Sequence, residues 1–192
     1  MSGYIIQNQN KLYYMTCTVV SWVDVFTRKK YCDTILESLS FCQEHKGLNL
    51  HAYVIMSHHI HIIVSAKEGR ALSHIIRDFK KHTSKSILKQ IAEDSGESRQ
   101  EWMMRIFKYH AKYNQNNTTY QFWQRGNHPI ELISPKWILQ KLNYIHYNPV
   151  KAGIVHQPEH YVFSSASNYL GQDVALSVQV LDLGVTDGYI HL

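Results

Sequence analysis

The sequence predicts an α+β fold in which an antiparallel sheet carries two helices on one face. Short runs of β-branched and aromatic residues alternate with longer runs of helical periodicity. Two of the strand-like runs are separated by only three residues, as in a hairpin. The elements follow in the order β-α-β-β-α-β, which is the ferredoxin-like (RRM-like) arrangement. The sheet face opposite the helices is therefore expected to be open and to hold an active site.

The first half of the chain supplies five of these elements. Strands are expected at residues 12–20, 50–56 and 60–65. Apolar residues recur at helical spacing between residues 28 and 45 and again between residues 71 and 91. Gly47 follows the first of these segments and is expected to end its helix. Because only residues 57–59 separate the second and third strands, histidines lie at the head of the second arm of the hairpin.

The second half of the chain is less regular. Residues 102–111 are too short and too mixed in character for a prediction. Residues 128–133 predict a fourth strand, after which Ser134 and Pro135 supply an N-cap and a first-turn proline for a helix. The core face of that helix is expected to consist of Ile138, Leu142 and Ile145.

Residues 1–192 are expected to form a single domain, with a C-terminal extension over about residues 157–192. Within the extension, residues 177–183 predict an edge strand. Hydrophobic residues make up 44% of the chain and charged residues 18%, as in an ordinary globular protein. Because the chain starts without a leader-like pattern and has no segment of membrane-spanning length, a cytoplasmic location and no membrane partner are expected.

Charge and cysteine content narrow the function classes. The net charge of +5 and a pI near 9.0 favour a polyanionic partner such as nucleic acid. Cys17, Cys32 and Cys42 form no C-x-x-C pair, which argues against a disulfide framework or a closed zinc site. The cysteines are expected to be buried, reduced thiols.

Residues 54–64, V-I-M-S-H-H-I-H-I-I-V, place histidines inside an apolar strand. Since alternate strand residues share a face, His59 and His61 stand together, roughly 7 Å apart at the backbone. Both rings can lean onto one metal ion from that spacing. The alternative is that they are merely polar residues on the wet face of an antiparallel strand. His58 faces the other way unless the turn bends it.

Residues 143–153, N-Y-I-H-Y-N-P-V-K-A-G, end the helix that Ser134 begins. Tyr144 and Asn148 are four residues apart and lie on one side of that helix, with Lys141 one turn earlier. A phenol and an amide are thus presented together. The alternative for Asn148 is a structural role at the helix boundary, where it precedes a proline. The alternative for Tyr144 is an aromatic side chain that packs over the sheet. For Tyr147 this structural role is the preferred interpretation.

Together, S-H-H-I-H-I-I-V and Y-I-H-Y-N-P-V-K-A-G resemble the HUH single-tyrosine transposases of the insertion-sequence-200-like superfamily, and within it the REP-associated tyrosine transposases. The resemblance extends to I-R-D-F-K-K-H-T on the long helix, to F-W-Q-R-G at 122–126 and to Y-V-F-S-S-A-S-N-Y at 161–169. A lone H-x-H is a weak signal, whereas the two motifs in this order on these elements are a specific one.

The resemblance implies that His59 and His61 bind a divalent metal, that Asn148 supplies a further ligand, and that Tyr144 is the catalytic nucleophile. Neutral nitrogen and oxygen ligands suit Mg²⁺ or Mn²⁺ beside a DNA phosphate. Attack by Tyr144 would cleave single-stranded DNA through a 5′-phosphotyrosine and allow rejoining, with a hairpin-marked site as the expected substrate. The family commonly has asparagine before the first histidine, and Ser57-His58 stand here instead, so participation of His58 stays open.

Basic residues indicate where DNA would bind. Arg77, Lys81, Lys85 and Lys89 recur every four residues and form one stripe on the long helix. Arg125 and Lys151 flank the two active-site segments. A solvated helix face is the alternative for the stripe. Between the helices lies a group of aromatic residues, namely Tyr109, Tyr113, Tyr120, Phe122 and Trp123. Some of them are expected to stack on unpaired bases and others to belong to the core.

Two other functions compete with the transposase. A non-catalytic ferredoxin-like nucleic-acid-binding module would carry aromatic residues where this chain has His59 and His61, which argues against it. A replication initiator or relaxase with the same metal motif is disfavoured by the short chain, which lacks any helicase-like segment. The sequence leaves open the target DNA, the native metal, a mobile or a housekeeping role, and whether the chain is a monomer or a homodimer.

Overall fold

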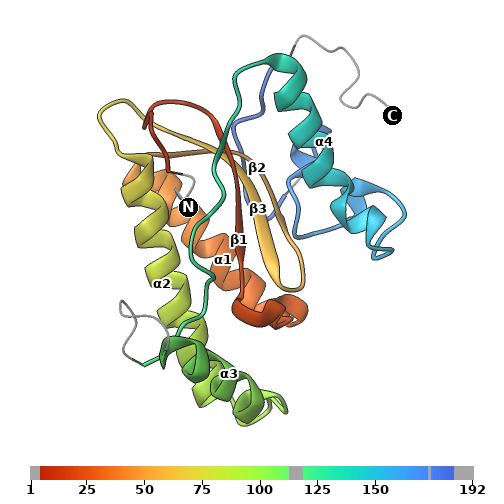
Figure 1. Cartoon of the computed structure of the whole chain (residues 1–192). Coiled ribbons are helices and arrows are strands. Elements are labelled where there is room, and N and C mark those ends of the chain that lie inside the picture. Colours follow the sequence, from red (N-terminus) through yellow and green to blue (C-terminus); the bar gives the residue numbers. More distant parts are fainter. Residues whose placement is uncertain (1–4, 113–118, 173, 184–192) are drawn as a thin grey trace.

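The computed structural model describes residues 5–112, 119–172 and 174–183. Its centre is a four-stranded antiparallel sheet in the order β2-β3-β1-β4, flanked by helices (Figure 1). The strands are β1 Tyr13–Thr18, β2 Leu48–Ile55, β3 His59–Ala66 and β4 Ile130–Glu131. The fold class is therefore α+β and ferredoxin-like, which confirms the prediction from the order of the elements.

The long helices lie on both faces of this sheet (Figure 1). Those on the first face are α1 Lys29–Phe41 and α2 Leu72–Glu93, and α4 Pro135–Lys151 crosses the opposite face. Helix α3, Gln100–Lys112, packs beside α2. Short helical turns complete the described chain at Val20–Trp22, Val25–Thr27, Pro158–His160 and Ala166–Tyr169. None of the described helices is long and apolar enough to span a membrane.

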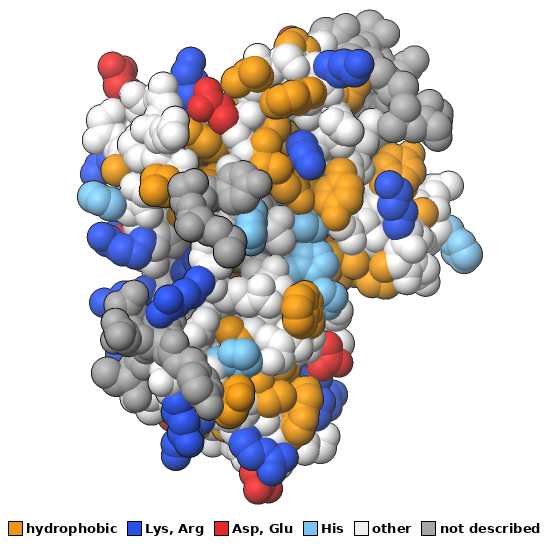
Figure 2. All heavy atoms as spheres, in the orientation of Figure 1, with side chains coloured by type: hydrophobic (Ala, Val, Ile, Leu, Met, Phe, Trp, Pro, Cys, Tyr) orange, Lys and Arg blue, Asp and Glu red, His pale blue; other side chains and the backbone are white. Residues whose placement is uncertain are grey.

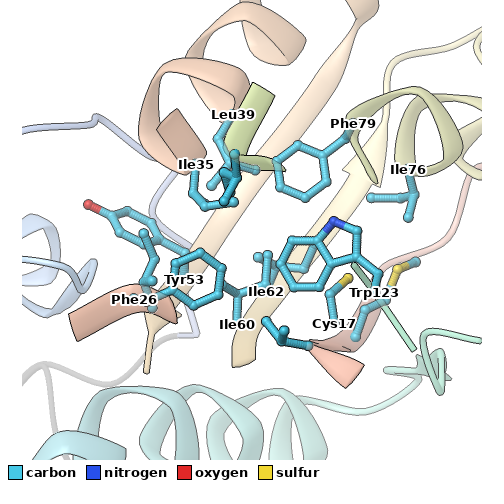
Figure 3. Packing of buried hydrophobic residues seen from close by; sticks show 14 of the residues in the cluster. Cys17, Phe26, Ile35, Leu39, Tyr53, Ile60, Ile62, Ile76, Phe79 and Trp123 are labelled. Atoms are coloured by element: carbon cyan, nitrogen blue, oxygen red, sulfur yellow. The ribbon is translucent and has the colours of Figure 1, made fainter. Parts of the chain in front are cut away.

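The main core fills the space between the sheet and helices α1 and α2. Alternate residues of β3, namely Ile60, Ile62 and Val64, are fully buried there. Figure 3 shows Ile60 and Ile62 among side chains from both helices, including Leu39 and Phe79. Burial of each such aliphatic side chain contributes about 1.5–3 kcal/mol to stability, so this face holds the sheet and the two helices together.

A smaller apolar cluster lies on the opposite face, beneath α4. Ile63 of β3 and Tyr14 of β1 pack there against Leu142 and Ile145 of the helix. Ser134 caps α4 by accepting a hydrogen bond from the Trp137 backbone N–H at 3.3 Å, as predicted. The face expected to be open is therefore partly covered, and the helix that covers it is the one that carries the tyrosine motif.

Several boundaries differ from the predictions. Helix α1 ends at Phe41, and a π-helical turn continues the chain over Cys42–Lys46. The turn closes at Gly47, whose φ of 77° favours glycine. Helix α3 occupies residues for which the sequence made no prediction. Strand β4 spans only two residues of the segment expected at 128–133, and His128, whose φ is 44°, lies outside it. The segment before β4 contacts β1 through isolated bonds, such as that from the Thr16 N–H to the Asn127 carbonyl at 3.0 Å.

The predicted edge strand at 177–183 is wrong. These residues have no strand structure, although Gln179 donates one backbone hydrogen bond to the Leu50 carbonyl of β2 at 2.8 Å. The free edge of β2 is shared with a second segment, because the Ile55 N–H donates to the Phe163 carbonyl and the Ser165 N–H to the Tyr53 carbonyl. Two short segments thus cover this edge of the sheet.

Candidate active site

The paired histidines lie side by side on the face of the sheet that α4 crosses. His61 is directly opposite Thr16 of β1, and His59 is opposite Thr18. The centroids of the His59 and His61 rings are 4.5 Å apart. The His58 ring also lies 4.5 Å from that of His59. The shared face of His59 and His61 agrees with the strand parity argued from the sequence.

Burial keeps these imidazoles neutral. It lowers the pKa of His59 to about 4, with a further contribution from the charge of His58. It lowers the pKa of His61 to about 3, helped by His59 and Lys141. At neutral pH each ring therefore has a nitrogen lone pair, which is the form of histidine that binds metal ions.

The two ring nitrogens of His61 have different surroundings. Nδ1 lies 2.8 Å from the Tyr14 hydroxyl and 2.8 Å from the Thr16 hydroxyl. Nε2 is buried and has no hydrogen-bond partner among the described residues. Since buried polar atoms are nearly always paired, an unpaired buried nitrogen calls for an explanation such as the binding of an ion. A divalent cation at this nitrogen fits the donor set.

Helix α4 brings the tyrosine to the histidines. The Tyr144 ring is 40% exposed, and its centroid lies 5.2 Å from that of His61 and 6.2 Å from that of Tyr14. Asn148 is one turn further along the helix and half-buried. The helix continues through Pro149 to Lys151, so Asn148 lies inside it rather than at its boundary.

The structure thus joins His59, His61 and Tyr144 in one site, with Asn148 on the adjacent helical turn. No three or more His, Cys, Asp and Glu side chains within the described ranges are arranged to hold a metal ion. Any protein ligand beyond the two imidazoles would therefore be of another type, such as the amide of Asn148, which follows Tyr144 by four residues on the same helix.

Two lysines accompany the tyrosine. Lys141 Nζ lies 4.7 Å from the centroid of the Tyr14 ring and 5.6 Å from that of Tyr144. Lys151 Nζ lies 6.0 Å from the Tyr144 centroid, which places one of the predicted DNA-binding residues at the site. Figure 2 shows histidines near the middle of one face of the molecule, with Lys and Arg side chains on both sides. The site is therefore suited to an anionic substrate.

Sequence reasoning missed three features of this site, namely Tyr14, Thr16 and the role of Lys141. Tyr14 and Thr16 alternate on the first strand, so their common face could be predicted. Their contact with His61 depends on the register between β1 and β3, which the sequence does not specify. Lys141 was placed near the tyrosine by helical spacing, without a contact to argue from.

The other predicted DNA-binding residues gather at a groove beside α2. Arg77, Lys81 and Lys85 line it from the helix, and Arg125 lines it from the segment at residues 119–127. The Lys80 amine fixes that segment by donating hydrogen bonds to the carbonyl oxygens of Gln124 and Gly126 and to Asn127 Oδ1. Three cations of the stripe and Arg125 of the loop therefore line one shared groove.

Not every member of the stripe is equally available. The Arg77 guanidinium is bound to Asp78 at 2.9 Å, and Lys89 lies near Glu93 at 3.9 Å and outside the groove. Among the aromatic residues, Phe122 and Trp123 belong to the core, whereas Tyr120 is half-buried in the groove wall and Tyr109 is exposed on α3. Tyr113 lies outside the described residues.

Comparison with known families identifies the family of the chain. Residues 9–108 match the family model described as "Transposase IS200 like", which covers more than half of the chain. The chain belongs to the IS200-like transposases. The prediction from the two motifs is confirmed at this level, and an enzymatic role in DNA cleavage follows from membership of the family.

The fold of this transposase also matches a solved structure over its whole length. The structure of the REP-associated tyrosine transposase bound to a REP hairpin superposes with a TM-score of 0.63, at 18% sequence identity over 100% of this chain and 99% of that one. A transposase candidate from Deinococcus radiodurans R1 reaches only 0.45, at 13% identity over 76% of this chain and 95% of that one. No curated protein sequence matches.

Proposed function

We propose that this transposase cleaves and rejoins one strand of DNA, with Tyr144 as the nucleophile. The observation that carries the proposal is the position of the Tyr144 ring, 5.2 Å from the ring of a neutral histidine whose Nε2 is buried without a partner in the described chain. A nucleophile and an unpaired nitrogen suited to metal binding are thus neighbours. Family membership supplies the reaction class, and the geometry supports these residues as the ones that perform it.

The reaction needs no external energy source. The Tyr144 oxygen attacks the scissile phosphorus, the new O–P bond forms, and the bond to the 3′ oxygen breaks. The phenolic proton leaves to solvent and the departing 3′ oxygen takes up a proton. The products are a 5′-phosphotyrosine and a free 3′-hydroxyl. Because one phosphodiester replaces another, the reverse attack by a 3′-hydroxyl rejoins the strand without a nucleotide cofactor.

Two imidazoles and one amide are proposed to hold the divalent ion. His59 and His61 are neutral at physiological pH because burial lowers the pKa of each ring, and Asn148 would add an oxygen from the same helix as the nucleophile. A bound Mg²⁺ or Mn²⁺ supplies Lewis-acid polarisation of the scissile phosphate. The amines of Lys141 and Lys151 beside the Tyr144 ring hold positive charge where the phosphate and the phenolate carry negative charge.

The groove beside α2 is proposed to bind the DNA backbone through Arg77, Lys81, Lys85 and Arg125. One segment connects it to the active site, because the Asn127 carbonyl accepts from the Thr16 N–H and the Thr16 hydroxyl contacts His61. A DNA strand that runs from the groove along residues 119–127 would therefore reach the histidines. The relative of similar fold is bound to a REP hairpin, which supports a hairpin with flanking single strand as the substrate.

A single-stranded substrate also follows from the use of one tyrosine. Cleavage requires that one phosphate bend onto the site, and paired strands resist that bend, whereas an unpaired strand is flexible. A folded hairpin beside it would offer a rigid shape for the groove to hold. Unpaired bases can in addition stack on aromatic rings such as Tyr120, at about 1–3 kcal/mol for each base.

The test is covalent capture on a suicide oligonucleotide that carries a hairpin and, after cleavage, loses the short upstream fragment that bears the new 3′-hydroxyl, so that rejoining is prevented. With Mg²⁺ or Mn²⁺, the wild-type protein should form an adduct that survives denaturation, and Tyr144→Phe should form none. Tyr147→Phe is the matched control, because it removes a hydroxyl from the same helix without touching the proposed nucleophile. An undiminished adduct in Tyr144→Phe would remove Tyr144 from the mechanism.

A further inference from the structure

We propose that Tyr14 and Thr16 are positioning residues that hold the His61 proton on Nδ1 and the His61 ring in one orientation, so that Nε2 presents its lone pair to the metal. The inference rests on the proposed function, because it takes His61 as a metal ligand. Neither Tyr14 nor Thr16 is proposed to touch the DNA or the metal. Both act through the histidine.

The hydrogen-bond pattern around Nδ1 favours one tautomer. The Tyr14 and Thr16 hydroxyl oxygens each lie 2.8 Å from this nitrogen, and the Thr16 hydroxyl donates to the Tyr14 oxygen at 3.3 Å. If Nδ1 carries the proton, its N–H donates to both oxygens and all three contacts are favourable. If Nδ1 is bare, Tyr14 can donate to it, but the Thr16 oxygen then faces a nitrogen lone pair without a proton between them.

The unpaired nitrogen supports the same tautomer. Nε2 is buried and meets no hydrogen-bond partner among the residues that the structure describes, so a proton there would be a buried donor with nothing to receive it. Buried donors without partners are rarer in proteins than buried acceptors without partners. With the proton on Nδ1, Nε2 is instead a lone pair, which a cation can use.

Packing fixes the ring as well as the proton. The Tyr14 ring is stacked on the His61 ring, with centroids 5.5 Å apart and an angle of 24° between the planes. Tyr14 is itself buried, and Thr16 is the direct cross-strand partner of His61. The Tyr14 ring also meets Tyr144 edge-on at 6.2 Å. One tyrosine thus contacts both the proposed ligand and the proposed nucleophile.

Partners of this kind have a measurable effect in metal sites. A hydrogen-bond acceptor on the second nitrogen of a metal-binding histidine fixes its tautomer and raises its basicity, and removal of that acceptor typically lowers metal affinity about 10–100-fold. Tyr14→Phe keeps the stacked ring and removes one acceptor. Thr16→Val keeps the side-chain shape and removes the other. The double variant should therefore fold normally and bind metal about 10–100-fold more weakly.

The test uses the full chain and two readouts that do not depend on cleavage. Nitrogen-15 NMR of the imidazoles reports the His61 tautomer without metal, and electron paramagnetic resonance of Mn²⁺ reports metal affinity. Tyr13→Phe and Thr34→Val are the matched controls, because they make the same chemical changes away from the site, on the core side of β1 and on α1. Circular dichroism and thermal unfolding verify the fold of each variant.

The outcomes separate this inference from the proposed function. We expect a Nδ1-protonated His61 in the wild type, a shift toward the Nε2-protonated form in the double variant, a parallel decrease in Mn²⁺ affinity, and neither change in the controls. Wild-type Mn²⁺ binding that the double variant retains with an unchanged tautomer would overturn this inference alone. A wild type that does not bind Mn²⁺ through His61 would overturn it together with the proposed metal site.

Discussion

The two faces of β3 perform different tasks. On the face toward α1 and α2, Ile60 and Ile62 are fully buried among other apolar side chains. On the other face, His59 and His61 replace the aliphatic residues, and one buried nitrogen of His61 has no partner in the described part of the chain. The first face is built for stability, whereas the second retains an unfavourable polar burial that only a ligand would offset. The difference shows where function has taken precedence over packing.

The largest expected effect separates the two faces by activity. His59→Ala or His61→Ala should abolish cleavage, because each removes a proposed metal ligand. DNA affinity should remain nearly unchanged, since the groove is lined by other residues. Ile62→Val, on the opposite face of the same strand, should cleave normally. Adduct formation and fluorescence anisotropy measure the two properties, and normal cleavage by His59→Ala with a defect in His58→Ala would transfer the ligand role to His58.

The next effect separates the faces by stability. Ile62→Ala leaves a cavity in the main core and should lower the free energy of unfolding by about 2–5 kcal/mol. His61→Ala should cost less, because it also removes the unpaired Nε2. Urea unfolding without metal measures both variants. If His61→Ala lowered the free energy of unfolding more than Ile62→Ala does, the proposed difference between the two faces would be wrong.

Strand periodicity explains how much of this could be predicted. Alternation along β3 correctly assigned His59 and His61 to one face, and helical spacing put Tyr144 and Asn148 on one side of α4. The partners of Nδ1 could not be predicted, because they depend on a register between β1 and β3 that no local pattern specifies. Helix α3 was missed because its segment is short and mixes apolar with charged residues, although its buried residues Met103, Phe107 and Ala111 recur every four positions.

The same limit applies to the edges of the sheet. The alternating residues at 177–183 resemble a strand, yet the β2 edge also bonds to residues 163 and 165, and competition for an edge is a tertiary property. The four-residue spacing of basic residues on the long helix predicted a stripe. Which of these residues line the groove could not be predicted. Lys89 lies outside the groove, and the Lys80 amine, which was not singled out, holds the loop that carries Arg125.

A smaller effect concerns acid stability. Burial lowers the pKa of His146 to about 3, against about 6.5 in an unfolded chain. Between those values the unfolded chain binds the extra proton, so the free energy of unfolding falls as pH drops below about 6.5 and is independent of this group above it. The cost is at most about 1.4 kcal/mol per pH unit.

His146→Gln should therefore lose less stability between about pH 7 and about pH 4.5 than the wild type does. Equal slopes in urea unfolding across that range would contradict the argument. Addition of Mn²⁺ distinguishes His146 from the histidines of the proposed metal site. At neutral pH the ion should raise the free energy of unfolding of the wild type and of His146→Gln equally. It should leave that of His61→Ala unchanged. A metal-dependent shift that disappears in His146→Gln would place the ion elsewhere.

The smallest effect is expected in the groove. Lys81→Ala and Lys85→Ala each remove one proposed phosphate-binding amine, so each should reduce the salt slope of DNA binding by about 0.7–0.9 without changing which oligonucleotide is preferred. Arg77 should contribute less, since Asp78 already binds it. Lys89→Ala is the matched control on the same helix. Affinity against salt for hairpin, unstructured and duplex oligonucleotides measures the slopes, and a preference for plain duplex would refute the single-strand substrate.

The most direct test of the central claim is to identify the residue that is covalently joined to DNA. The adduct formed on the suicide oligonucleotide with Mn²⁺ would be digested with nuclease and protease, and the nucleotide-bearing peptide sequenced by mass spectrometry. The account predicts a single modified peptide that carries a 5′-linked phosphodiester on Tyr144. Modification of Tyr147 or of another residue, or a phosphate joined through its 3′ side, would contradict it.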